Sequence, residues 1–248
     1  MRSLFYLPLV FSLVLNHSVA TEQIHQITSL RPCNGFDFPV GPPDADGFYK
    51  SRGFIPGVHL GEDWISTQGS HHSLGKPIYS IAAGKVILAR DIHVAWGKVV
   101  ITRHAYLEGG KVKFVDALYA HLDRIDVTEG EYVSRGQKIA TMGNNHGMYP
   151  AHLHFEMHKD LRIGVNHTGF VRTLVSYWIP TDFIVKRRKL PTNAPTTPLP
   201  VTHFDIPAPW KHFFKKKSSK KKGINTHTKH ALVPSAGGKK QMPTVSGK

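Results

Sequence analysis

Cysteine is almost absent from this sequence, with Cys33 the one cysteine among 248 residues. An intramolecular disulfide framework and an all-cysteine zinc site are therefore excluded. Long apolar runs are also scarce, because no run after residue 20 approaches the roughly 20 residues that a membrane-spanning helix needs. We expect no transmembrane segment, and we expect the single thiol to be buried and inert.

Acidic residues are almost absent from the C-terminal quarter, residues 186–248. The formal net charge is +15, and residues 186–248 hold 15 Lys and Arg against Asp205 alone, whereas residues 21–185 balance 16 basic with 16 acidic residues. A uniformly basic nucleic-acid binder is thereby excluded. Prolines and a self-repelling lysine run predict a disordered, Pro-rich and Lys-rich tail over residues 186–248. We expect this tail to attract anionic envelope polymers rather than a specific nucleic acid; a tail that only aids solubility is the alternative.

The first twenty residues have the organisation of an export signal. Arg2 supplies a short positive region, residues 4–15 are apolar, and Ser18-Val19-Ala20 is a small-residue cleavage site. We predict a signal peptide over residues 1–20 and an exported, periplasmic or extracellular protein that starts near Thr21. A buried N-terminal helix is the alternative.

No long helical period occurs in the middle of the chain. Short apolar, β-branched segments separated by glycines predict strands, and Gly109-Gly110 predicts a hairpin turn. We expect a strand over 98–103 followed by a long loop with His104, and another strand over 111–120. The chain is therefore predicted to be an all-β protein with an antiparallel sheet or sandwich over residues 55–185, preceded by a lead-in segment over 21–54.

Histidine is frequent in this sequence, with 17 among 248 residues. Three clusters stand out: His59-Leu-Gly-Glu-Asp63, Tyr119-Ala-His121 and His152-Leu-His154. In an extended segment, alternate side chains share a face, so His59 and Asp63 point the same way, with Gly61 predicted to leave open space between them, and the two imidazoles of His152 and His154 also pair.

A catalytic zinc ion keeps three protein ligands and leaves one position for water, and two histidines with one carboxylate suit it. Spacing alone does not choose the three ligands among the five candidates. A thermolysin-like site is excluded because no His-Glu-x-x-His motif is present. The remaining histidines, including His71, His93, His104, His146 and His158, are interpreted as structural or exposed, although His71-His72 could trap a second metal ion.

These motifs resemble the LytM/lysostaphin-type M23 metallopeptidases. The resemblance rests on the three clusters with Gly143 and Phe155-Glu156, and on the connecting segments 75–86 and 127–139. It implies a domain like the duplicated hybrid motif, with an antiparallel sheet and a catalytic groove. It also implies one Zn²⁺ per chain, with His59, Asp63 and His154 as ligands and His121 and His152 as catalytic histidines.

The family resemblance further implies an endopeptidase that cuts the peptide stems or cross-links of bacterial peptidoglycan. A neutral histidine can take the proton of the attacking water, and a protonated one can steady the oxyanion or protonate the leaving amine. The sequence does not divide these tasks between His121 and His152, and it reveals no acceptor behind the histidine ligands.

Three other functions compete with this interpretation. The family includes members that have lost ligands and activate other wall hydrolases, but all five positions are filled here. A β-rich carrier module is suggested by the segment 129–138, although carriers of this type work in the cytoplasm. Polyanion binding or cell-wall binding rests on the tail alone.

Overall fold

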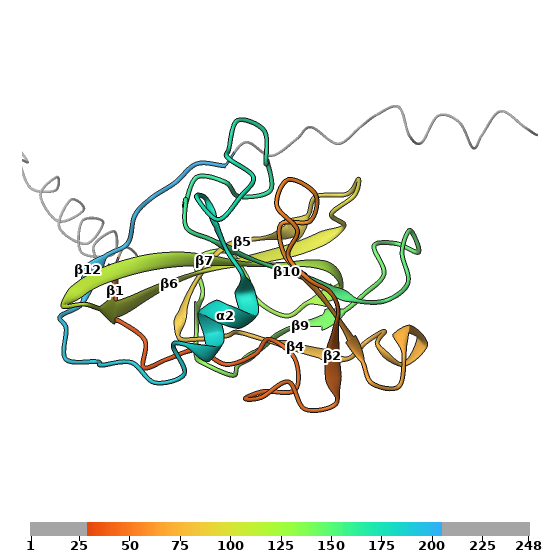
Figure 1. The fold of residues 1–248 in the computed structure, drawn as a ribbon, viewed down its shortest axis with the longest axis horizontal. Helices are drawn as coiled ribbons and strands as arrows, with labels where there is room; N and C mark the ends of the chain where they lie inside the picture. The colour runs from red at the N-terminus through yellow and green to blue at the C-terminus, as the bar shows by residue number, and fades with distance from the viewer. Residues whose placement is uncertain (1–28, 205–248) are drawn as a thin grey trace, which may run out of the picture. The chain divides into compact units, whose positions relative to one another are not determined.

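The computed structural model describes residues 29–204 (Figure 1). The predicted signal peptide and most of the Lys-rich tail lie outside these residues. The described elements run in this order: β1 (Ser29–Leu30), β2 (Phe48–Arg52), β3 (Glu62–Ser66), the short 3₁₀ turn η1 (Ser70–His72), β4 (Pro77–Tyr79), β5 (Gly84–Asp91), β6 (Lys98–Glu108), β7 (Lys111–Ile125), β8 (Tyr132–Val133), β9 (Lys138–Met142), β10 (Leu153–His158), β11 (Tyr177–Trp178), α2 (Pro180–Val185) and β12 (Thr197–Pro198).

The sheet is antiparallel throughout, which confirms the predicted fold class. Its main path is β2-β3-β10-β7-β6-β5-β8, while β9 pairs with β4 and β7, and β11 pairs with β10. Strands distant in sequence thus become neighbours: β10 lies between β3 and β7. Within the described residues, no helix is long and apolar enough to cross a membrane.

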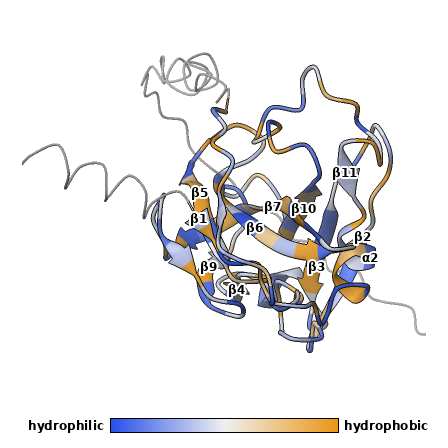
Figure 2. Ribbon diagram, turned by 90° about the vertical axis from the view of Figure 1, so that its left-hand side faces the viewer, coloured by the Kyte–Doolittle hydropathy of each residue, from blue (hydrophilic) through white to orange (hydrophobic). Residues whose placement is uncertain are grey.

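Both faces of the central strands are covered. Val100 and Tyr119 pack into the main apolar cluster, whereas their neighbours Ile101 and Leu118 pack into a second cluster on the opposite face. Period-two alternation explains this division, because successive side chains of a strand point to opposite faces. Figure 2 shows hydrophobic and hydrophilic residues mixed along the same strands. The β6–β7 pair therefore separates two packed layers.

The long hairpin corrects two sequence predictions. The prediction of a loop after Arg103 is wrong, because β6 continues to Glu108 and pairs with β7 across the predicted Gly109-Gly110 turn. Ala105 and Tyr106 are buried, so this segment packs as a strand despite its polar neighbours. The strand predicted to end at residue 120 also continues, to Ile125.

An irregularity in β7 interrupts its alternation at His121. Lys98 pairs with Leu122 and Val100 with Tyr119, so Ala120 and His121 together face Val99 alone. This is a β-bulge, and His121 adopts a left-handed conformation with φ of 61°. The extra residue lets Leu122 enter the main core while His121 faces away from it.

The segments on either side of the predicted domain also contact it. In the lead-in, Cys33, Phe36 and Val40 are buried in the main core, and burial raises the pKa of the Cys33 thiol to about 11. In the predicted tail, Arg187 is buried, and β12 pairs with β1. The described part of that segment, residues 186–204, therefore folds back onto the domain, and a truncation designed to remove only the tail should follow residue 204.

His104 is expected to make the protein sensitive to acid. Burial lowers the pKa of His104 to about 4 from 6.5, although a hydrogen bond to the Ala83 carbonyl acts in the opposite direction. The contribution of neutral His104 to the free energy of unfolding is fully present above pH 6.5 and is lost as the pH falls towards 4. The reason is that the unfolded chain binds a proton at this histidine at a higher pH than the folded protein does. This gap corresponds to roughly 3 kcal/mol in the free energy of unfolding.

Between about pH 7 and pH 4, the free energy of unfolding should therefore fall by roughly 3 kcal/mol less in His104→Gln than in the wild type. Urea unfolding at several pH values measures the difference. His71→Gln, on an exposed turn, is the control and should follow the wild type. Parallel curves for His104→Gln and wild type would contradict the assignment.

Candidate metal centre

Strand β10 carries a row of polar residues on one face. His154, Glu156 and His158 alternate with Leu153, Phe155 and Met157, and the latter three enter the main core. All six are buried, so the polar row lies beneath the surface. The pairing of β10 with β3 sets His154 directly opposite Asp63. The predicted site is therefore assembled by strand register.

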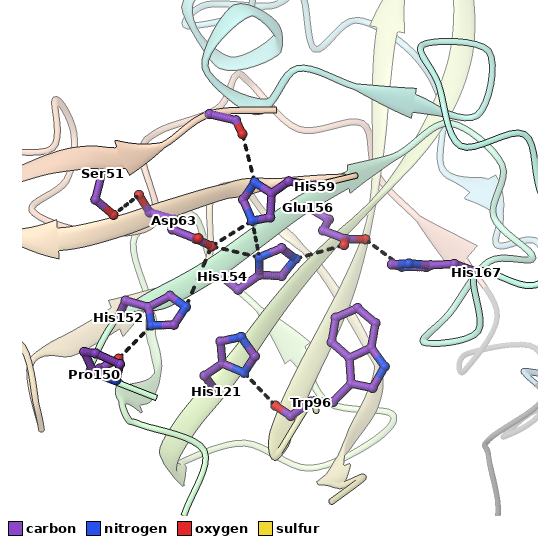
Figure 3. Close-up of polar contacts among 11 residues, drawn as sticks. Ser51, His59, Asp63, Trp96, His121, Pro150, His152, His154, Glu156 and His167 are labelled. Atoms are coloured by element: carbon purple, nitrogen blue, oxygen red, sulfur yellow. Dashed lines mark hydrogen bonds and ion pairs between the residues drawn. The ribbon is translucent and has the colours of Figure 1, made fainter. Parts of the chain in front are cut away.

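Three predicted ligands converge on one point (Figure 3). His59 Nε2 lies 3.0 Å from Asp63 Oδ1 and 3.1 Å from His154 Nδ1, and His154 Nδ1 lies 2.9 Å from Asp63 Oδ1. Ligands of a tetrahedral zinc ion lie about 2.0–2.2 Å from the metal, and hence about 3.3 Å from one another. The three atoms have nearly that separation.

In His59 and His154, the ring nitrogen that points away from the shared point, here called the outer nitrogen, has a hydrogen-bond partner. His59 Nδ1 lies 2.8 Å from the Gly53 carbonyl oxygen, and His154 Nε2 lies 2.9 Å from Glu156 Oε1. Donation of an N–H to each acceptor leaves the inner nitrogens as lone pairs, which is the tautomer that a metal ion requires. Glu156 is thus the acceptor that the sequence did not reveal.

The charges at this point favour a cation. Burial alone would raise the pKa of Asp63, but hydrogen bonds from His154 and His59 hold it below its usual range, so the carboxylate is ionised. Burial alone would lower the pKa of His154, whereas hydrogen bonds to Asp63 and Glu156 raise it to about 9. The two carboxylates thus favour a positive charge at His154, and a metal ion at its inner nitrogen would take the place of the proton there. The donor set and its surroundings therefore fit a divalent metal ion.

Gly61 has a different role from the expected one. The sequence suggested open space beside it, but this prediction is wrong: a Cβ on Gly61 would lie 2.4 Å from the carbonyl oxygen of Phe155. The glycine allows β10 to approach the segment between His59 and Asp63 closely. Any larger residue would move His154 away from the other two ligands.

His121 and His152 lie beside this cluster. Their ring centroids are 4.8 Å apart, and His152 Nε2 lies 3.8 Å from Asp63 Oδ1. His121 Nδ1 lies 3.1 Å from the Trp96 carbonyl and His152 Nδ1 lies 2.8 Å from the Pro150 carbonyl, so each Nε2 is the nitrogen left for chemistry. Burial lowers the pKa of His121 to about 3, which keeps this ring neutral.

All five predicted residues line one pocket of about 410 Å³. Trp96 and Tyr149 also line it, as do Arg52 and Arg172. The pocket supplies a place for a substrate beside the two catalytic candidates, and its two arginines add positive charge to its lining. Of these residues, only the five histidine and aspartate side chains were predicted from the sequence.

Glu156 joins three histidines. Its Oε1 contacts His154, and its Oε2 lies 2.7 Å from His158 Nε2 and 3.2 Å from His167 Nε2. The spacing of His154, Glu156 and His158 at every second residue could have shown that they share a face. His167 lies in a loop, and no local pattern marks it.

Glu156→Gln is expected to weaken zinc binding about 10- to 100-fold, because the amide cannot accept all three N–H groups and no longer fixes the ring of His154. Competition with a chromogenic chelator measures the dissociation constant. Glu129→Gln, which alters a half-exposed pair with Arg90, is the matched control. Unchanged affinity in Glu156→Gln would remove Glu156 from the metal centre.

Comparison with known proteins agrees with the motifs. The family model of Peptidase family M23 matches residues 58–166. The peptidoglycan DD-endopeptidase ShyB of Vibrio cholerae is 38% identical over 84 residues, which are 34% of this chain and 18% of ShyB. This chain therefore matches less than a fifth of that relative's length.

Two solved structures are also similar. A zinc-containing peptidase from Vibrio cholerae is 31% identical, with a TM-score of 0.41, over 50% of this chain and 37% of that chain. Lysostaphin from Staphylococcus simulans is 22% identical, with a TM-score of 0.39, over 56% of this chain and 50% of that chain.

Proposed function

Because residues 58–166 belong to peptidase family M23, we propose that this protein is an exported zinc endopeptidase that hydrolyses peptide bonds in bacterial peptidoglycan. One observation carries the proposal: His59, Asp63 and His154 present three ligand atoms to a single point within a pocket that also holds His121 and His152. The similarity to a peptidoglycan DD-endopeptidase supports the substrate class.

The proposed roles follow from the hydrogen bonds. His59, Asp63 and His154 hold the metal ion, and bound zinc supplies a Lewis acid and a water of lowered pKa. Trp96 and Pro150 fix the rings of His121 and His152 through their carbonyl oxygens. Each Nε2 is then free to accept the proton of the attacking water or, once protonated, to donate to the oxyanion or the leaving amine.

The environments of the two histidines suggest a division of labour. His121 is buried and neutral, whereas the side chain of His152 is more exposed and approaches the Asp63 carboxylate. A neutral imidazole can accept a proton, and the second histidine of the pocket is left for the later steps. We therefore assign proton acceptance from water to His121, and stabilisation of the developing charge and protonation of the leaving amine to His152.

Digestion of defined muropeptides tests the proposal. The zinc-loaded protein should release fragments whose masses identify the cleaved bond, and a chelator should stop the release until zinc is restored. Zymography on purified murein gives a second readout. A folded, zinc-loaded protein that cleaves neither substrate would instead favour a catalytically silent activator.

A further inference from the structure

A second group of metal-ligand side chains lies beside the pocket. Asp91 ends β5, His93 lies in the turn between β5 and β6, and His146 lies in the loop between β9 and β10. Their ligand atoms all lie within 4.8 Å of one another. We propose that Asp91, His93 and His146 form a second, exchangeable binding site for a divalent transition-metal ion of the zinc class.

The carboxylate of Asp91 is central to the group. Its Oδ2 lies 2.9 Å from His146 Nε2, and its Oδ1 lies 3.3 Å from His93 Nδ1. The backbone N–H of His93 donates to the same Oδ1 over 2.9 Å, which fixes the orientation of the carboxylate. The imidazole rings stack with centroids 5.9 Å apart and an interplanar angle of 29°. One nitrogen of each ring and one carboxylate therefore border the same small space.

The donor set indicates the kind of ion. Two imidazoles with one carboxylate suit Zn²⁺, Cu²⁺ or Ni²⁺, whereas Mg²⁺ and Ca²⁺ prefer oxygen ligands alone. The side chains of His93 and His146 are 47% and 52% exposed, against 8% for His59 in the proposed catalytic centre. The rings can therefore rotate towards an ion arriving from solvent, and the ion can leave again.

A metal ion at this position would connect two segments that line the pocket. The turn 92–97 includes Trp96, and the loop 143–152 includes Tyr149 and His152; all three line the pocket. One direct bond between turn and loop is already present, from Asn145 Nδ2 to the Val94 carbonyl oxygen over 2.9 Å. A metal ion shared by His93 and His146 would add a second link and hold these pocket-lining segments together.

Zinc titration of the full chain tests this inference. After one equivalent of zinc has been bound, isothermal titration with further Zn²⁺ should detect an additional ion in the wild type. His93→Asn combined with His146→Asn should bind one ion fewer. Asparagine tolerates the left-handed backbone of both positions, where φ is 60° and 55°. His71→Asn with His72→Asn, on the exposed turn η1, is the matched control and should retain the wild-type stoichiometry.

Hydrogen exchange supplies a readout independent of stoichiometry. The second equivalent of zinc should slow amide exchange in residues 92–97 and 144–151 of the wild type and the control, but not of the double variant. Identical stoichiometry in the wild type and the double variant would overturn the inference, as would zinc-dependent protection that persists without both imidazoles. These readouts do not depend on peptidase activity, so they remain decisive if the proposed function fails.

Discussion

Asp63→Ala is expected to eliminate metal-dependent hydrolysis, with kcat/KM reduced by at least about a thousandfold. A bound zinc ion contributes several kcal/mol to the stabilisation of the transition state, and each 1.36 kcal/mol is tenfold in rate. Asp63 Oδ1 touches both proposed histidine ligands, so its removal leaves two imidazoles without their shared carboxylate. Muropeptide turnover and zinc content by elemental analysis measure the effect.

Two further variants separate chemistry from misfolding. Asp63→Asn keeps the shape of the side chain and should also lose zinc and activity, because the neutral amide is a poor metal ligand. Asp126→Asn, which alters a surface pair with Arg124, should keep both, since exposed ion pairs contribute only about 0–1 kcal/mol. Full turnover in a folded Asp63→Ala protein would refute the proposed centre.

His121→Asn and His152→Ala are expected to lower kcat by about 10²- to 10⁴-fold while the zinc content stays equal to that of the wild type, because proton transfer by a positioned side chain contributes on that scale. Asparagine at position 121 suits the left-handed backbone of the bulge. Steady-state kinetics on a defined muropeptide, with zinc analysis of the same samples, measures both quantities.

The pH profile distinguishes the two histidines. Loss of the group that accepts a proton from water should remove the acidic limb of the profile of kcat/KM, whereas loss of the group that donates to the leaving amine should remove the basic limb. Our assignment expects the acidic limb to disappear in His121→Asn and the basic limb in His152→Ala. If either variant lost zinc, that histidine would be a metal ligand rather than a catalytic residue.

Much of the centre was accessible to sequence analysis because its residues occur in short motifs with regular spacing. His154 lies two residues from His152, and Asp63 lies four residues from His59, so each motif brings two candidates together locally. The sequence does not state which strands are neighbours. The placement of β10 between β3 and β7 depends on the burial of Leu153, Phe155 and Met157 in a core that no single motif describes.

Other features escaped prediction for physical reasons. The continuation of β6 beyond Arg103 was missed because His104 and Glu108 suggest a solvent-exposed loop, whereas His104 is fully buried with a hydrogen bond to the Ala83 carbonyl. The bulge at His121 was missed because left-handed backbone usually calls for glycine. The contribution of Glu156 depends on His167, a residue in a distant loop.

The bulge in β7 makes the length of this strand as important as its composition. One residue fewer between Tyr119 and Leu122 would set a single residue opposite Val99 and restore regular alternation, so Leu122 would keep its place in the main core. The deletion would instead remove the extra residue whose left-handed backbone turns an imidazole towards the pocket. The fold can therefore tolerate a shorter β7 at this point, whereas the pocket cannot, because it would lose one of its two catalytic candidates.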